Sequence, residues 1–303
     1  MAEGMGSPTD SRARIAGLPI WEGTIEIEPL LGGISNESWL VSDARGRHVV
    51  RFGKDYPFHH VLREREVMTA RAAEQAGFAP ALEYAAPGVM VSRYLGARTY
   101  GAADVRANVA PIARLIRVFH DTMPRHVSGP GFMFWPFYVI RDYARTLREG
   151  KSRMVPHLPD YLELADELEA AQVPLPIVFG HNDLLPANLL DDGERLWLID
   201  FEYAGFSTAM FDLAGLSSNA GFSAEESEAL LGYYFGTTPD LPVSRALAAM
   251  QCASLLREAM WSMVSEIHLD APGTDYVAYT QDNLSRLESA LDAYRTQYGR
   301  HNR

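Results

Sequence analysis

Two short stretches decide the fold: residues 179–190, which read FGHNDLLPANLL, and residues 198–202, which read LIDFE. An apolar run that closes at Phe179 predicts a buried strand leading into a polar loop. The Asp-Asp-Gly sequence at residues 191–193 lies between two apolar runs, and this pattern is a strong signal for a β-hairpin. The chain is therefore expected to form a strand, a loop and a hairpin in succession.

The predicted hairpin brings polar side chains of both stretches together. It folds Asn188 back to the level of Asp200, with Glu202 just beyond, so that an amide oxygen and carboxylates face one another. Oxygen ligands of this kind suit Mg²⁺, which keeps waters and takes the rest of its shell from substrate phosphates. Asp183 lies on the same loop, five residues before Asn188, where it can reach a hydroxyl group beside a metal-bound phosphate.

The order of these residues is that of a kinase catalytic loop. An aspartate, four residues, an asparagine, a hairpin and a second aspartate follow one another in eukaryotic-type kinases. The motifs here read His-Asn-Asp-x-x-x-x-Asn and Asp-Phe-Glu, where protein kinases have His-Arg-Asp and Asp-Phe-Gly. With these departures the chain resembles the superfamily of aminoglycoside phosphotransferases and choline/ethanolamine kinases, and residues 199–205 and 211–213 resemble the choline/ethanolamine kinase branch. The alternative, two solvated carboxylates in turns and a capping asparagine, does not account for the flanking apolar strands.

The resemblance implies an enzyme that uses ATP and Mg²⁺ to phosphorylate a small molecule. It implies a catalytic set of Asp183, Asn188 and Asp200. In this set Asp183 would orient the acceptor hydroxyl and take its proton, while Asn188 and Asp200 would bind Mg²⁺. Glu202 would assist a second metal ion. Such transfer depends mainly on positioning and on neutralising the charge of the phosphates.

The resemblance also implies an α+β fold with two lobes, like that of protein kinases. We expect a flexible tail over residues 1–20, a nucleotide-binding lobe over 21–95 with a small antiparallel sheet, and a larger, mainly helical lobe over 96–303. His181 and Asp212 would support the catalytic loop, Asp212 by accepting hydrogen bonds from its backbone N–H groups. Five strands are expected in the smaller lobe, over residues 25–31, 38–41, 48–52, 78–84 and 88–96.

A glycine-rich turn between the first two expected strands is a candidate phosphate site. Residues 32–36 read Gly-Gly-Ile-Ser-Asn, and such a turn lets backbone N–H groups close over phosphate oxygens. The same pattern also fits an ordinary hairpin turn. The resemblance favours Ser35 and Asn36 as nucleotide contacts.

Arg51 stands where kinases have a phosphate-binding lysine, and its guanidinium is a forked donor for phosphate or carboxylate. A helix is expected over residues 57–75, with Glu66 on its partly apolar face. A carboxylate on such a face needs a partner, so an ion pair between Arg51 and Glu66 is predicted. Glu64 is the competing partner. A solvent-facing Arg51 and an exposed Glu66 remain the plainer alternatives.

The last two expected helices carry the candidate acceptor site. Choline kinases close a cation pocket with tryptophan and tyrosine rings from these elements, and Trp261, Tyr276 and Tyr279 match that pattern. A ring facing an ammonium group contributes about 0.5 to 2 kcal/mol. Glu258 stands where a second tryptophan is typical and Asn219 where an acidic residue is typical, and a carboxylate near the pocket would favour an amine. Aromatic packing between helices is the alternative reading.

Composition narrows the classes of partner. The 303 residues are 47% hydrophobic and 22% charged, as in an ordinary globular protein, and the formal net charge is -12. This charge argues against binding to nucleic acids or anionic membranes, and suits a cationic substrate. The single cysteine, Cys252, allows neither an internal disulfide nor a zinc cluster. No apolar run is long enough to span a membrane and the N-terminus has no apolar signal core, so a cytoplasmic protein is expected.

The sequence thus predicts an ATP-dependent kinase for the hydroxyl group of an amino alcohol, choline or ethanolamine above all. Another kinase of the same superfamily, acting on thiamine, an aminoglycoside or a sugar, is the nearest alternative. A nucleotide-binding pseudokinase is the alternative from another class, although all three catalytic positions are filled. A homodimer is compatible with the sequence, which does not fix the oligomeric state.

Overall fold

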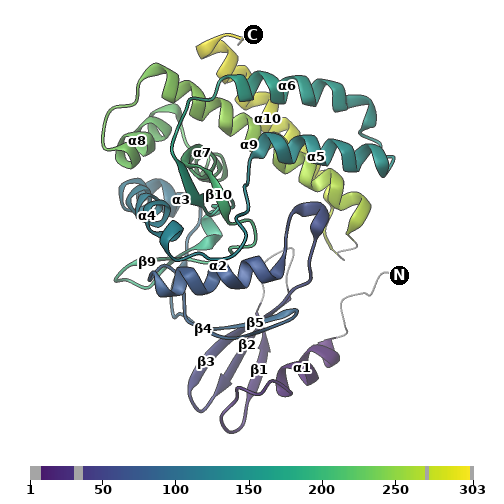
Figure 1. Cartoon of the computed structure of the whole chain (residues 1–303), viewed down its shortest axis with the longest axis vertical. Helices are drawn as coiled ribbons and strands as arrows, with labels where there is room; N and C mark the ends of the chain where they lie inside the picture. Colours follow the sequence, from purple (N-terminus) through teal and green to yellow (C-terminus); the bar gives the residue numbers. More distant parts are fainter. Residues whose placement is uncertain (1–7, 31–36, 270–272, 301–303) are drawn as a thin grey trace.

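The structure is a computed structural model, and it describes residues 8–30, 37–269 and 273–300. Two lobes are visible in Figure 1. The smaller lobe holds a sheet with helices α1 and α2, and the larger lobe is mainly helical. The predicted α+β, two-lobed fold is confirmed.

The sheet of the smaller lobe has the five predicted strands, all antiparallel, in the order β1-β2-β3-β5-β4. Side chains alternate along the central strands, so that Trp39, Val41, Val50 and Val91 point into one apolar core. Strand β4 begins later than predicted, because the Phe78 carbonyl accepts a hydrogen bond from the backbone of the hairpin in the larger lobe instead of a sheet partner. The strands are β1 (Glu26–Pro29), β2 (Glu37–Asp43), β3 (Gly46–Phe52), β4 (Leu82–Ala86) and β5 (Val89–Arg93).

Helix α1 (Pro8–Ala16) corrects the prediction of a flexible tail over residues 1–20. Ile15 is fully buried in the core of the smaller lobe, and its carbonyl accepts a hydrogen bond of 2.6 Å from the indole of Trp21. The guanidinium of Arg14 lies 4.1 Å from the centre of the Phe52 ring. These tertiary contacts order a polar segment whose composition alone does not suggest an ordered structure. Residues 1–7 lie outside the described part of the chain.

The predicted helix over residues 57–75 is wrong at its start. A short 3-10 helix, η1 (Pro57–His59), comes first, and α2 (Arg63–Gln75) begins only after a left-handed residue, His60, with φ of 61°. A non-glycine residue in this conformation is uncommon and interrupts a helix. The interruption turns His59 away from α2.

His59 and Phe58 tie this turn to the larger lobe. The ring of His59 stacks on Trp261 with centroids 5.0 Å apart, and its Nε2 lies 2.9 Å from the hydroxyl of Ser265. Phe58 stacks on His268 at 4.5 Å. In Figure 1 the turn before α2 reaches across to helix α9. Burial of the His59 ring and stacking of the half-buried Phe58 ring against the other lobe are tertiary contacts that outweigh continuation of the helix.

The larger lobe is built around α9 (Leu241–His268), a long helix buried along most of its length. Small and apolar side chains dominate it, which lets neighbouring helices pack closely on several sides. No helix among the described residues combines the length and the apolar composition needed to cross a membrane. The other helices are α3 (Ala102–Ala107), α4 (Val109–Thr122), α5 (Pro136–Glu149), α6 (Leu158–Ala170), α7 (Ala209–Ala220), α8 (Ala224–Phe235) and α10 (Tyr276–Tyr298).

Short strands of the larger lobe carry the two sequence stretches. The predicted hairpin is confirmed: β8 pairs with β9, and Leu189 lies opposite Leu198. The strand before the loop, β7, is also confirmed, and it pairs with a strand that follows the second stretch, β10. These strands are β6 (Arg98–Thr99), β7 (Ile177–Gly180), β8 (Leu189–Asp191), β9 (Leu196–Leu198) and β10 (Gly205–Thr208).

Candidate active site

The loop after β7 is held by Asp212, near the start of α7. Its two carboxylate oxygens accept backbone N–H groups of His181 and Asn182, each at 2.7 Å, and His120 Nε2 lies 2.7 Å from the same carboxylate. Burial opposes ionisation of Asp212, but the hydrogen bonds and charge of His120 outweigh it and lower its pKa. An ionised carboxylate therefore fixes the entrance of the loop, as predicted for this residue.

His181 and Asn182 lock the loop to the segment after the hairpin. Burial lowers the pKa of His181, which keeps the ring neutral, and its Nε2 donates to the Ile199 carbonyl at 2.9 Å. Asn182, with a left-handed φ of 60°, donates from its side chain to the carbonyls of Tyr203 and Gly205 at 3.1 and 3.2 Å. His181 thus links the two sequence stretches by a hydrogen bond, at the position where a supporting role was predicted for it.

Asp183 follows directly and lies at the wall of a cavity in the larger lobe. Burial raises its pKa well above the usual value, and the nearby carboxylate of Glu258 raises it further. The guanidinium of Arg257 opposes this shift. The backbone carbonyl of Asp183 accepts a hydrogen bond of 2.8 Å from the Asn188 side-chain amide. The side-chain nitrogen of Asn188 is thereby used inside the loop, and its oxygen is the atom suited to a cation.

Asp200 lies beside Asn188 at the end of the hairpin, where the Ile199 N–H donates to the Asn188 carbonyl at 3.1 Å. Asp200 has a left-handed φ of 67°, and such strain in a non-glycine residue is often found at functional sites. Its Oδ1 accepts a hydrogen bond of 2.8 Å from Arg51. Arg51 also pairs with Glu66, which confirms that predicted ion pair; Glu64, the competing partner, is exposed.

Glu202 joins the same charge network. Arg63 bridges the Glu202 and Glu66 carboxylates at 3.0 and 2.6 Å. Burial and the neighbouring Asp200 raise the pKa of Glu202, while Arg63 opposes the shift. Together with Arg51, the network holds three carboxylates and two guanidinium groups, which leaves one net negative charge. The sequence did predict Glu202 beside the metal position, but not that an arginine would hold it.

The donor set fits a magnesium ion that is only partly coordinated by protein. Within residues 8–30, 37–269 and 273–300, no three His, Cys, Asp or Glu side chains gather into a metal site of their own. The amide oxygen of Asn188 and the carboxylate of Asp200 supply two hard ligands, and Mg²⁺ commonly takes the rest from water and phosphates. Ser35 and Asn36, the predicted nucleotide contacts, lie outside the described residues, so their role stays a prediction.

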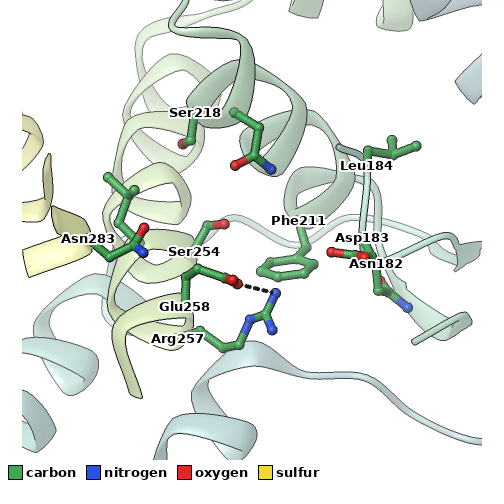
Figure 2. A pocket seen from close by; sticks show the side chains of 12 residues that line it. Asn182, Asp183, Leu184, Phe211, Ser218, Ser254, Arg257, Glu258 and Asn283 are labelled. Carbon is green, nitrogen blue, oxygen red and sulfur yellow. Dashed lines mark ion pairs between the residues drawn. The ribbon is translucent and has the colours of Figure 1, made fainter. Parts of the chain in front are cut away.

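The cavity beside Asp183 is lined mainly by polar groups from α7, α9 and α10. Figure 2 shows the Arg257 guanidinium beneath the ring of Phe211, with Glu258 on one side and Asp183 on the other. Arg257 is buried, and its Nη2 lies 3.0 Å from a Glu258 oxygen. Burial disfavours its charge, but Glu258 and the other acidic groups around it raise its pKa.

Arg257 is a buried, charged residue of the cavity wall that sequence reasoning missed. It interrupts the apolar run of α9 next to Glu258, and adjacent opposite charges in a buried helix were a usable signal. Buried charges are expected to be paired, since an unpaired one is costly. The pair could have been recognised as part of a cavity wall rather than as a solvated helix face.

The three predicted pocket rings do come together. The ring centre of Trp261 lies 6.0 Å from that of Tyr276 and 6.1 Å from that of Tyr279. Trp261 is also covered by His59 and donates its indole N–H to the hydroxyl of Tyr203 at 3.0 Å. Among the described residues that line the cavity beside Asp183, none of the three predicted rings is found.

Comparisons with known proteins agree with this arrangement. A probable ethanolamine kinase of Arabidopsis thaliana is 26% identical, over 86% of this chain and 79% of the relative. The crystal structure of a choline/ethanolamine kinase family protein from Mesorhizobium loti matches with a TM-score of 0.76 and 27% identity, over 94% of each chain. The choline kinase LicA from Streptococcus pneumoniae has the same fold, with a TM-score of 0.73 and 22% identity over 93% of this chain and 98% of that one.

The family comparison covers most of the chain, and includes both stretches that carry the candidate catalytic residues. The sequence pattern of the family described as APH, phosphotransferase enzyme family, matches residues 26–247. This chain belongs to the phosphotransferase enzyme family.

Proposed function

We propose that the protein is a kinase that transfers the γ-phosphoryl group of ATP to the hydroxyl group of a small amino alcohol, of the ethanolamine or choline type. One observation carries the proposal: Asp183, Asn188 and Asp200 lie on one loop and one hairpin, with a polar cavity behind Asp183. This arrangement supports a metal-bound phosphate on one side and an acceptor alcohol on the other.

Asp183 is the proposed base. The acceptor hydroxyl oxygen forms a bond to the γ-phosphorus, the bond from that phosphorus to the leaving oxygen of ADP breaks, and the hydroxyl proton passes to Asp183. A carboxylate acts best as a base when its pKa approaches the working pH. Burial raises the pKa of Asp183, and the guanidinium of Arg257 opposes the rise.

Asn188 and Asp200 are the proposed magnesium ligands, and Mg²⁺ would neutralise charge that develops on the phosphates. Asp200 would exchange its bond to Arg51 for the metal, which frees the guanidinium to bind phosphate oxygens. Glu66 would keep Arg51 in place, as their ion pair supports. Glu202 could assist a second ion only by giving up its contact with Arg63.

The remaining assignments follow the same reasoning. Ser35 and Asn36 would contact the nucleotide, and the lobes would divide near residue 95, with the nucleotide bound between them. Dependence on ATP supports a cytoplasmic site of action. Glu258 is the proposed acceptor contact from α9, because it lines the cavity together with Asp183.

A panel of acceptors tests the proposal. The full-length protein is incubated with Mg·ATP and choline, ethanolamine, thiamine or kanamycin, and ADP release is measured against a control without acceptor. Release above the control with an amino alcohol supports the proposal. Release with thiamine or kanamycin alone would assign the chain to another kinase of the family, and a dead protein that still binds Mg·ATP would be a pseudokinase.

A further inference from the structure

The composition of the acceptor cavity distinguishes between kinds of amino alcohol. We propose that the site selects an acceptor whose ammonium group carries N–H bonds, as in a primary amino alcohol, over one with a trimethylammonium group. This inference rests on the proposed function. In place of the aromatic cage expected from the sequence, a hydrogen-bonding site centred on Glu258 would bind the ammonium group of the acceptor.

Glu258 has hydrogen-bonding capacity left for a ligand. One carboxylate oxygen faces Arg257 at 3.0 Å, and the other accepts the hydroxyl of Tyr279 at 2.8 Å. An ionised carboxylate offers about four acceptor positions. Two positions are thus used by the protein, and they orient the carboxylate, while the others can receive N–H donors in the cavity.

The charge of the site suits a single cation. Asp183 and Glu258 bring two carboxyl groups to the cavity wall and Arg257 brings one guanidinium group, so the wall carries one net negative charge when both carboxyl groups are ionised. Ser218 and Asn283 add polar groups to the same wall. An ammonium group therefore meets an acceptor-rich surface, and its hydroxyl arm can extend toward Asp183.

Two aromatic rings near the site already have partners within the protein. His59 stacks on Trp261, and the indole N–H of Trp261 is bound to Tyr203. Phe211 is an aromatic ring on the cavity wall, and the guanidinium of Arg257 lies 5.9 Å from its centre. A second cation at this ring would be repelled by the first. Cation–π interactions with these two rings would therefore contribute little to the binding of choline.

A trimethylammonium group would leave the acceptors of the site without donors. Buried polar groups that lose their partners cost binding energy, and sites built around a donor on the substrate discriminate strongly against analogues that lack it. We therefore expect a preference of at least about tenfold in kcat/KM for the primary amine over its trimethyl analogue.

A methylation series tests this preference directly. The full-length protein with Mg·ATP is assayed with ethanolamine, N-methylethanolamine, N,N-dimethylethanolamine and choline, whose ammonium forms carry three, two, one and no N–H bonds. The expected result is a stepwise fall in kcat/KM along the series. Choline used as well as ethanolamine would overturn the specificity and leave the proposed function standing. Turnover of none of the four would overturn both.

Two variants locate the source of the preference. Tyr279→Phe removes the hydroxyl that orients Glu258, and Glu258→Gln removes the charge; both should reduce the ratio of ethanolamine to choline kcat/KM by several-fold. Trp261→Phe tests the aromatic cage, and the ratio should stay as in the unmodified protein. A selective loss of choline turnover in Trp261→Phe would overturn the proposal. Thermal melts identify a variant that fails to fold, and the methylation series on the unmodified protein remains decisive in that case.

Discussion

Replacing Asp212 with asparagine tests how strongly the catalytic loop depends on one buried carboxylate. Asp212 accepts two backbone N–H groups at 2.7 Å and contacts His120 at the same distance. Asparagine keeps the shape but offers only one acceptor oxygen, so at least one backbone N–H of His181 or Asn182 would face an NH₂ group. A hydrogen bond to a charged group contributes about 1.5 to 3 kcal/mol, and breaking a buried charge pair costs about 3 to 5 kcal/mol.

We therefore expect Asp212→Asn to lower the free energy of unfolding by about 3 to 5 kcal/mol, out of a total of about 5 to 15 kcal/mol for a typical domain. The melting temperature should fall by roughly 10 °C. Since the same bonds position Asp183, kcat should fall by about 10²-fold in the part that still folds. Calorimetric melts and steady-state kinetics below the melting temperature measure the two effects.

The matched control is Asp282→Asn, an exposed aspartate on α10, for which the stability change should stay within about 0.5 kcal/mol. If Asp212→Asn melted within 2 °C or so of the unmodified protein and kept its kcat, the anchoring argument would be refuted. The pH dependence gives a second check. Because the folded state lowers the pKa of Asp212, its stabilising contribution is present above the unfolded pKa and is lost as the pH falls through the folded pKa.

Four further predictions concern the chemistry. Asp183→Asn should reduce turnover by about 10² to 10⁴-fold with nearly unchanged nucleotide affinity, and equal ADP release would contradict its role as base. Asp200→Ala should abolish binding of Mg·ATP in titration calorimetry, whereas affinity like that of the unmodified protein would exclude Asp200 as a metal ligand. The acid limb of the kcat/KM profile should lie above pH 3.8, the ordinary pKa of aspartate, because burial raises the pKa of Asp183 and only its ionised form accepts a proton. Arg257→Met should move this limb to still higher pH, since it removes the opposing charge; a limb at unchanged pH would show that Arg257 does not act on Asp183.

The catalytic core was predictable because its signals are local. The hairpin follows from a turn sequence between apolar runs, and pairing within it brings Asn188 close to the segment that carries Asp200. The pair of Arg51 and Glu66 was also predictable, since a carboxylate on a partly apolar helix face requires a cation. The spacing of these residues along the chain and the chemistry of their side chains were sufficient to predict their positions.

Long-range contacts account for what the sequence did not reveal. The break before α2 depends on space for His59 in a different lobe, and helix α1 depends on the core that receives Ile15. The three rings of the expected aromatic cage do not line the cavity beside Asp183, and Trp261 stacks instead on His59. The position of a partner two hundred residues away is not encoded in local periodicity.

The junction of Phe58 and His59 with α9 has a consequence for how the lobes can move. The buried ring of His59 and the half-buried ring of Phe58 both stack on α9, so the start of α2 would travel with α9 during any rotation of one lobe against the other, and this point would act as a pivot. Strands β1, β2 and β3, which lie far from this pivot in Figure 1, would be displaced over a long arc. Opening and closing of the enzyme would thus be a hinge rotation, with the hinge next to the acceptor cavity and the largest displacement on the nucleotide side.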